Sequence, residues 1–204
     1  MIENYVKFLE FIQDRLNTFF ENQKEYIFCK KGCARCCKNA QFPYSLTEVQ
    51  YLLKGAIELD CDIQEKIKEN ILNILKEKKK FKGEVFKYDC PFLIDNVCCV
   101  YEYRGIVCRT FGLVNQNPKD KDSKLKVPFC YKFGLNYSNV MDEKQNKITQ
   151  EKIAKAHTKE EPHGFNIDYH FLTGDDFERG FNFSFGEKKA LIDWFYDFGW
   201  ESKI

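Results

Sequence analysis

Residues 29–37 read CKKGCARCC, and this stretch decides how the rest of the chain is interpreted. It contains Cys29, Cys33, Cys36 and Cys37, interrupted by a glycine and by basic side chains. The segment is too short and too polar for a core element, so a loop that opens into a helical turn is predicted. Thiolate is a soft ligand that selects zinc, copper(I) or iron-sulfur clusters. Short spacings let one segment offer two sulfurs to one centre at little loop-closure cost.

The other cysteines are spread along the chain, which has ten in total. A single buried cysteine is ordinarily a core residue. We expect Cys61 and Cys99 to be core residues. For Cys130 the roles of core residue and metal ligand are equally expected. The candidate metal ligands are Cys29, Cys33, Cys36, Cys37, Cys90, Cys98, Cys108 and Cys130.

Two pairs of cysteines are consecutive in the sequence. Consecutive side chains point to opposite faces of a strand and lie about 100° apart around a helix. Cys36 and Cys37 are therefore expected to serve different metal atoms or different roles. The same argument separates Cys98 from Cys99.

The composition is that of a globular protein with its own core. The chain has 204 residues, of which 44% are hydrophobic and 31% charged, and this suits one domain. A formal net charge of +1 does not indicate the basic surface that is typical of nucleic-acid-binding proteins. The first residues lack the apolar run of a signal peptide, and no stretch approaches the ~20 apolar residues that span a bilayer. We expect a cytoplasmic protein, where cysteines indicate metal or redox chemistry rather than disulfides.

The predicted fold class is α+β and mainly helical, with several helices around an irregular cysteine-rich metal-binding centre that has short strands or knuckles. Ser45 and Glu48 form a capping box before an apolar run. Hydrophobic periodicity predicts helices over 3–28, 47–59, from 62 onward, 142–159 and 186–198. Short strands or knuckles are expected within 87–94, 97–101 and 106–114, and an exposed loop at 115–127.

One domain over residues 1–204 is predicted to contain two regions. Residues 29–130 form the cysteine-cluster metal-binding core. Residues 131–204 form an aromatic-rich C-terminal helical extension.

The order of the cysteine blocks resembles a known family. CKKGCARCC is followed by CPFLIDNVC at 90–98 and VYEYRGIVCRTFG at 100–112. Together these resemble the YkgJ family of cysteine-cluster proteins, also described as the zinc- or iron-chelating CxxCxxCC domain. Cys29 matches that pattern with one extra residue in its gap, and Gly105 stands where the family usually has proline. The motif positions are Cys33, Cys36, Cys37, Cys90, Cys98 and Cys108.

The resemblance also implies an alternative function. The family is similar to the cysteine-rich part of flagellin lysine N-methylase, an iron-sulfur enzyme that uses S-adenosylmethionine. The alternative is thus a methylase-like enzyme that acts on a protein or peptide substrate. The sequence has no GxGxxG motif after a strand to cradle that cofactor.

A thiolate-bound iron-sulfur centre, with 4Fe-4S favoured, is the main prediction for the cofactor. The cysteine blocks contain no histidine, and eight candidate ligands could serve two clusters. Cys90-Pro91 is similar to the cysteine-proline pair that ends the cysteine run of bacterial ferredoxins. Zinc held by four cysteines is the alternative. Arg104 and Arg109 are expected to lie beside the sulfurs and offset their charge, unless they form surface ion pairs instead. The role would be structural or redox.

Overall fold

Helices supply most of the regular structure, and the strands of the computed structural model are short and paired in twos. The structure describes residues 2–117 and 124–200. The predicted α+β, mainly helical class is confirmed. The described residues form two compact units, each built from segments distant in sequence. Unit 1 is formed mainly by residues 31–108 and 183–200, and unit 2 by residues 3–30 and 109–182.

Unit 1 is built on three helices, α2 (Leu46–Ile57), α3 (Cys61–Lys80) and α8 (Leu191–Asp197). The capping box predicted before α2 is present. The Ser45 hydroxyl accepts from the Glu48 N–H, and the Glu48 carboxylate accepts from the Ser45 N–H. Because both ends of this contact satisfy otherwise orphaned N–H groups, the helix begins where the sequence predicts.

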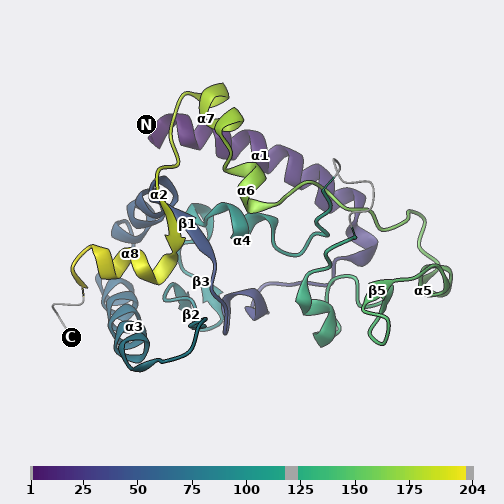
Figure 1. Ribbon diagram of the computed structural model, residues 1–204, viewed down its shortest axis with the longest axis horizontal. Coiled ribbons are helices and arrows are strands. Elements are labelled where there is room, and N and C mark those ends of the chain that lie inside the picture. Colours follow the sequence, from purple (N-terminus) through teal and green to yellow (C-terminus); the bar gives the residue numbers. More distant parts are fainter. Residues whose placement is uncertain (1, 118–123, 201–204) are drawn as a thin grey trace. The chain divides into compact units, whose positions relative to one another are not determined.

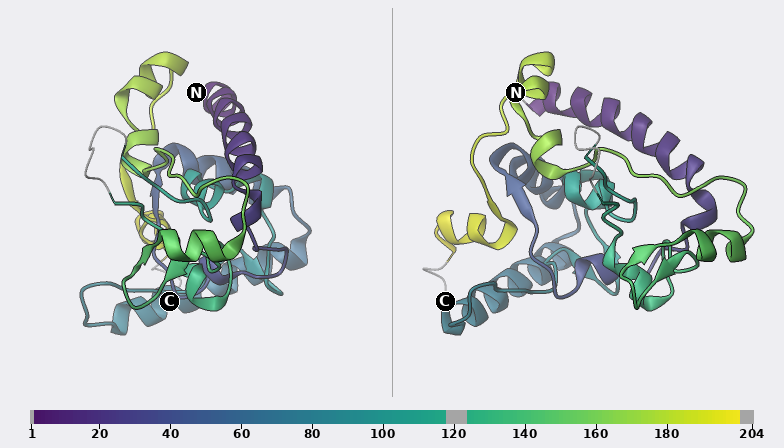
Figure 2. Two further views of the ribbon diagram at one scale, coloured as in Figure 1. Left: turned by 90° about the vertical axis from the view of Figure 1, so that its right-hand side faces the viewer. Right: turned by 45° about the vertical axis from the view of Figure 1, so that its right-hand side comes forward.

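A two-stranded sheet joins the start of α2 to the start of α8. β1 (Pro43–Ser45) pairs antiparallel with β6 (Lys188–Ala190), so Tyr44 lies opposite Lys189. Figures 1 and 2 show the two strands side by side, with β6 leading into the yellow helix α8. The helices and this sheet share one apolar cluster, whose fully buried members include Val49, Leu52, Ile71, Ile192 and Phe195.

The cysteine-rich part of unit 1 is made of short elements. They are the 3₁₀ turn η2 (Arg35–Cys37), the hairpin β2 (Leu93–Ile94) and β3 (Val97–Cys98), the 3₁₀ turn η3 (Tyr101–Tyr103) and helix α4 (Ile106–Thr110). The hairpin turns at Asp95 and Asn96, both with positive φ, which these two residue types tolerate. Within 106–114 the structure has a helix over Ile106–Thr110 instead of an extended segment.

Unit 2 contains the long N-terminal helix α1 (Ile2–Asn22), which ends earlier than expected and is followed by η1 (Lys24–Tyr26). Phe8 of α1 packs against the rings of Phe177 and Phe181 in α7. The remaining elements are η4 (Phe129–Phe133), β4 (Met141–Asp142), β5 (Lys147–Ile148), α5 (Gln150–Ala156), α6 (Tyr169–Leu172) and α7 (Asp175–Phe181).

One sequence prediction differs from the structure in unit 2. Instead of one helix over 142–159, the hairpin β4–β5 precedes the shorter helix α5. Part of the predicted loop at 115–127 lies outside the described residues, and Asn115 bridges to Lys126 across it. No helix in the described ranges is long and apolar enough to cross a membrane.

Candidate metal centre

The sulfurs of Cys36 and Cys37 lie 3.8 Å apart in the 3₁₀ turn η2. The turn follows Ala34, whose φ of 53° is left-handed, and the Cys37 N–H donates to the Ala34 carbonyl at 3.0 Å. The expectation that these consecutive side chains diverge is therefore not met. It assumed a strand or a regular helix, whereas a tight turn lets both half-buried side chains reach the same side.

This sulfur separation has a chemical meaning. Metal–sulfur bonds of about 2.3 Å arranged tetrahedrally place neighbouring sulfurs about 3.8 Å apart. The Cys36–Cys37 pair therefore has the spacing of two ligands on one metal atom.

Backbone hydrogen bonds bring Cys90 to this turn. The Cys90 N–H donates to the Cys37 carbonyl at 2.8 Å. Nearby, Ala40 and Tyr88 exchange two backbone hydrogen bonds, of 3.0 and 3.1 Å. The segment before Cys90 is thus attached to the segment after Cys37, although more than fifty residues separate the two cysteines in the sequence.

The β2–β3 hairpin carries the next pair of cysteines. Cys98 lies opposite Leu93, whose N–H donates to the Cys90 carbonyl at 3.0 Å. The thiol of Cys99 instead donates to the Phe92 carbonyl at 3.2 Å. Cys99 is thus engaged with the backbone of the hairpin.

Cys108 comes from helix α4. Its sulfur lies 3.1 Å from the hydroxyl of Tyr44. The N–H of Ile106, at the start of α4, donates to Oε1 of Glu48 at 2.9 Å. Glu48 is only 1% exposed, so the carboxylate that caps α2 also fixes the position of the helix that carries Cys108.

The titration behaviour of the thiols shows that they share one neighbourhood. Burial raises the pKa of Cys108 to about 12, and the charges of Cys98 and Cys36 contribute to the rise. Burial also raises the pKa of Cys90, and the charge of Cys108 is the second largest cause of this rise. The pKa of Cys37 is raised first by its hydrogen bond with Cys36, and further by burial and by the charges of Cys36, Cys90 and Cys108. Charge interactions thus connect these five sulfurs, and the charge of Cys99 also acts on Cys90.

Cys36 shows the opposite shift. Its hydrogen bond with Cys37 lowers its pKa to about 7, and the positive charge of Arg104 acts in the same direction. The guanidinium of Arg104 lies 3.6 Å from the ring centroid of Tyr101 and donates to the Tyr101 carbonyl at 2.8 Å. Its charge also lowers the pKa of Cys98, against the larger effect of burial. The charge of Arg104 thus acts on two of the sulfurs.

The other predicted site residues have different surroundings. Arg109 belongs to unit 2, where it is buried and donates to Oε1 of Gln13 at 2.9 Å. Cys29 and Cys130 also belong to unit 2, Cys29 exposed and Cys130 buried in η4. Cys33 is half-buried in the loop before η2.

The ligand set is not arranged as a finished coordination sphere. Over residues 2–117 and 124–200, no group of three or more histidine, cysteine, aspartate or glutamate side chains is positioned to hold a metal ion. None of the ten cysteines, all of which lie in these ranges, forms a disulfide.

Sequence reasoning did not include Tyr44 in the site. The signal that could have found it is Gly105, because a glycine can mark a close approach of another group to the backbone. An ideal Cβ at Gly105 would lie 2.6 Å from a ring carbon of Tyr44 and 2.9 Å from Oε1 of Glu48. The glycine therefore marks a close approach of Tyr44 to the segment that carries Cys108.

No protein-family model matches this chain, and neither a curated protein nor a solved structure matches it.

Proposed function

We propose that unit 1 is a metal-binding module that uses the thiolates of Cys36, Cys37, Cys90, Cys98 and Cys108. The observation that carries the proposal is the 3.8 Å separation of the Cys36 and Cys37 sulfurs, which suits two ligands on one metal atom. The backbone bond from Cys90 to Cys37 supports it, because this bond holds a third sulfur-bearing segment against the pair.

The electrostatics of the cluster favour a cation. Burial raises the pKa of Cys90 and of Cys108, so neither ionises readily without a positive partner. The positive charge of Arg104 acts on Cys36 and Cys98. A bound metal ion would ionise the thiols and offset the charge of several thiolates at once.

Completing the coordination sphere requires side-chain rotation. Cysteine χ1 has three staggered wells, and a change of well redirects the sulfur without moving the backbone. Cys90 and Cys98 are the candidates for this movement, because backbone contacts already fix the segments that carry them, whereas the Tyr44 hydroxyl already holds the sulfur of Cys108. Metal binding would then add to the folding stability of unit 1.

The geometry of the cysteine pair bears on the identity of the metal. Two cysteines bind one metal atom in zinc tetrathiolate sites and in two-iron clusters. In a four-iron cluster each iron takes one thiolate, so the Cys36–Cys37 pair would have to open from 3.8 Å. The pair thus favours zinc or a two-iron cluster over the 4Fe-4S cluster predicted from the sequence. Both fit the zinc- or iron-chelating character of the resembled family, of which we propose this chain is a divergent member.

Metal analysis of the anaerobically purified full chain tests the proposal. Wild-type protein is expected to retain at least one zinc or iron per chain, and Cys36→Ser is expected to lose most of it. Cys61→Ser is the matched control, because Cys61 is exposed at the start of α3 and is not among the proposed ligands. Wild-type protein that neither retains nor takes up zinc or iron would refute the proposed function.

A further inference from the structure

Tyr44 is a buried polar residue in direct contact with the sulfur cluster. Its side chain is 3% exposed, and its hydroxyl lies 3.1 Å from Sγ of Cys108. A hydroxyl can donate one hydrogen bond, whereas a thiolate can only accept. Once Cys108 is ionised, Tyr44 is necessarily the donor of this contact.

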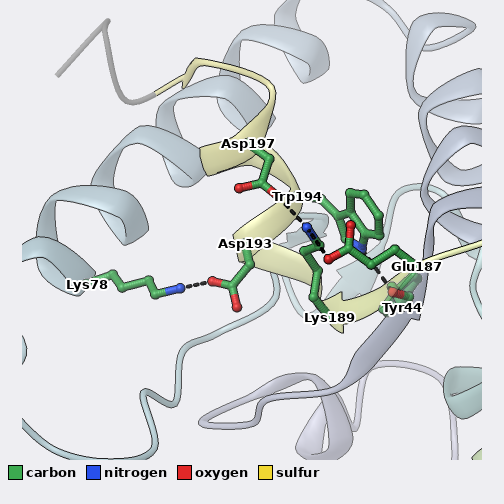
Figure 3. Close-up of polar contacts among 7 residues, drawn as sticks. All are labelled: Tyr44, Lys78, Glu187, Lys189, Asp193, Trp194 and Asp197. Carbon is green, nitrogen blue, oxygen red and sulfur yellow. Dashed lines mark hydrogen bonds and ion pairs between the residues drawn. The ribbon is translucent and has the colours of Figure 1, made fainter.

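The position of Tyr44 is set by groups other than the cysteines. Its backbone pairs with Lys189 across the β1–β6 sheet, and its carbonyl accepts a 2.9 Å hydrogen bond from Nε1 of Trp194 in α8. Figure 3 shows this bond beside Lys189, which lies between Glu187 and Asp197. Because strand and helix both hold Tyr44, its hydroxyl is aimed at the sulfur before any metal binds.

Space for the ring is made by Gly105. A Cβ at this position would lie 2.6 Å from the Tyr44 ring, closer than real contacts allow. Proline, which the resembled family usually has here, would collide with the ring in this geometry. Glycine at 105 is therefore what permits a tyrosine at 44 to reach the sulfur of Cys108.

We propose that Tyr44 is a positioning residue of the metal centre, whose hydroxyl donates a hydrogen bond to the Cys108 thiolate and so fixes the direction and electron density of that ligand. This inference rests on the proposed function. Partners in the outer shell orient the ligands of a metal, and their removal typically costs 10–100-fold in metal affinity.

The test is cobalt titration of the metal-free full chain under anaerobic conditions. Tyr44→Phe keeps the ring and removes only the hydroxyl, so cobalt affinity is expected to fall about tenfold. The sulfur-to-cobalt charge-transfer band is expected to shift at saturating cobalt, because one thiolate loses its hydrogen-bond donor. This shift does not depend on stability, so a destabilised variant still gives an answer.

Tyr88→Phe is the matched control. Tyr88 is buried in the same apolar cluster, but its hydroxyl accepts from the Ile192 N–H at 3.1 Å. It should retain the wild-type band and affinity. Equal affinity and band position in wild type and Tyr44→Phe would overturn the inference and leave the proposed function standing. The same changes in both variants would overturn the inference, because they would show a general packing effect. Wild-type protein that takes up neither cobalt, zinc nor iron would overturn both proposals.

Discussion

Gly105 lies directly against the ring of Tyr44, so that a single added carbon would come within 2.6 Å of it. Gly105→Ala is therefore expected to push the ring away from Cys108 and to destabilise unit 1. Overpacking of a buried site costs about 1–3 kcal/mol, and the loss should appear as a lower urea midpoint of the metal-free protein. An unchanged midpoint would show that the close approach is not real. Gly180→Ala is the control, because a Cβ there meets nothing within 4 Å.

The buried carboxylate of Glu48 should matter more than a helix cap ordinarily does. It accepts from the N–H groups of both Ser45 and Ile106, so Glu48→Ala leaves two donors without this acceptor. We expect a loss of about 2 kcal/mol or more in the free energy of unfolding, together with weaker metal retention, because α4 carries Cys108. Ser45→Ala removes only the cap and should cost about 1 kcal/mol. Equal losses in the two variants, measured by chemical denaturation, would contradict the link to α4.

Metal affinity should rise with pH. Burial raises the pKa of Cys90, and it raises that of Cys108 to about 12, so both thiols are protonated near neutrality in the metal-free chain. A bound metal ion must displace these protons. Below the pKa of the thiols, each increase of one pH unit therefore raises the metal affinity roughly tenfold for every proton released. Zinc titrations at two pH values in the neutral range, with proton release followed in weak buffer, measure this slope. Affinity that does not change with pH would mean that these thiols are not ligands.

Local sequence signals predicted part of the fold well. The start of α2 follows from Ser45 and Glu48, because a capping box is a contact between near neighbours. The apolar stripe at 186–198 correctly placed α8, although its first residues form β6 instead.

Contacts between distant segments account for what sequence reasoning missed. The residues Ile106 and Val107 favour a strand locally, but the carboxylate of Glu48 binds the Ile106 N–H and caps a helix there. Tyr44 could not be placed near Cys108, because its position depends on pairing with β6 almost 150 residues away. Cys36 and Cys37 were expected to diverge because no local signal revealed the tight turn that follows Ala34.

X-ray absorption spectroscopy at the edge of the bound metal tests the central proposal most directly, because it counts the atoms around the metal. The fitted shell is expected to contain only sulfur, at about 2.3 Å, and Cys37→Ser should replace one sulfur by a lighter atom. A shell of nitrogen and oxygen alone, or a sulfur count that is the same in wild type and Cys37→Ser, would contradict the assignment of Cys36 and Cys37 to one metal atom.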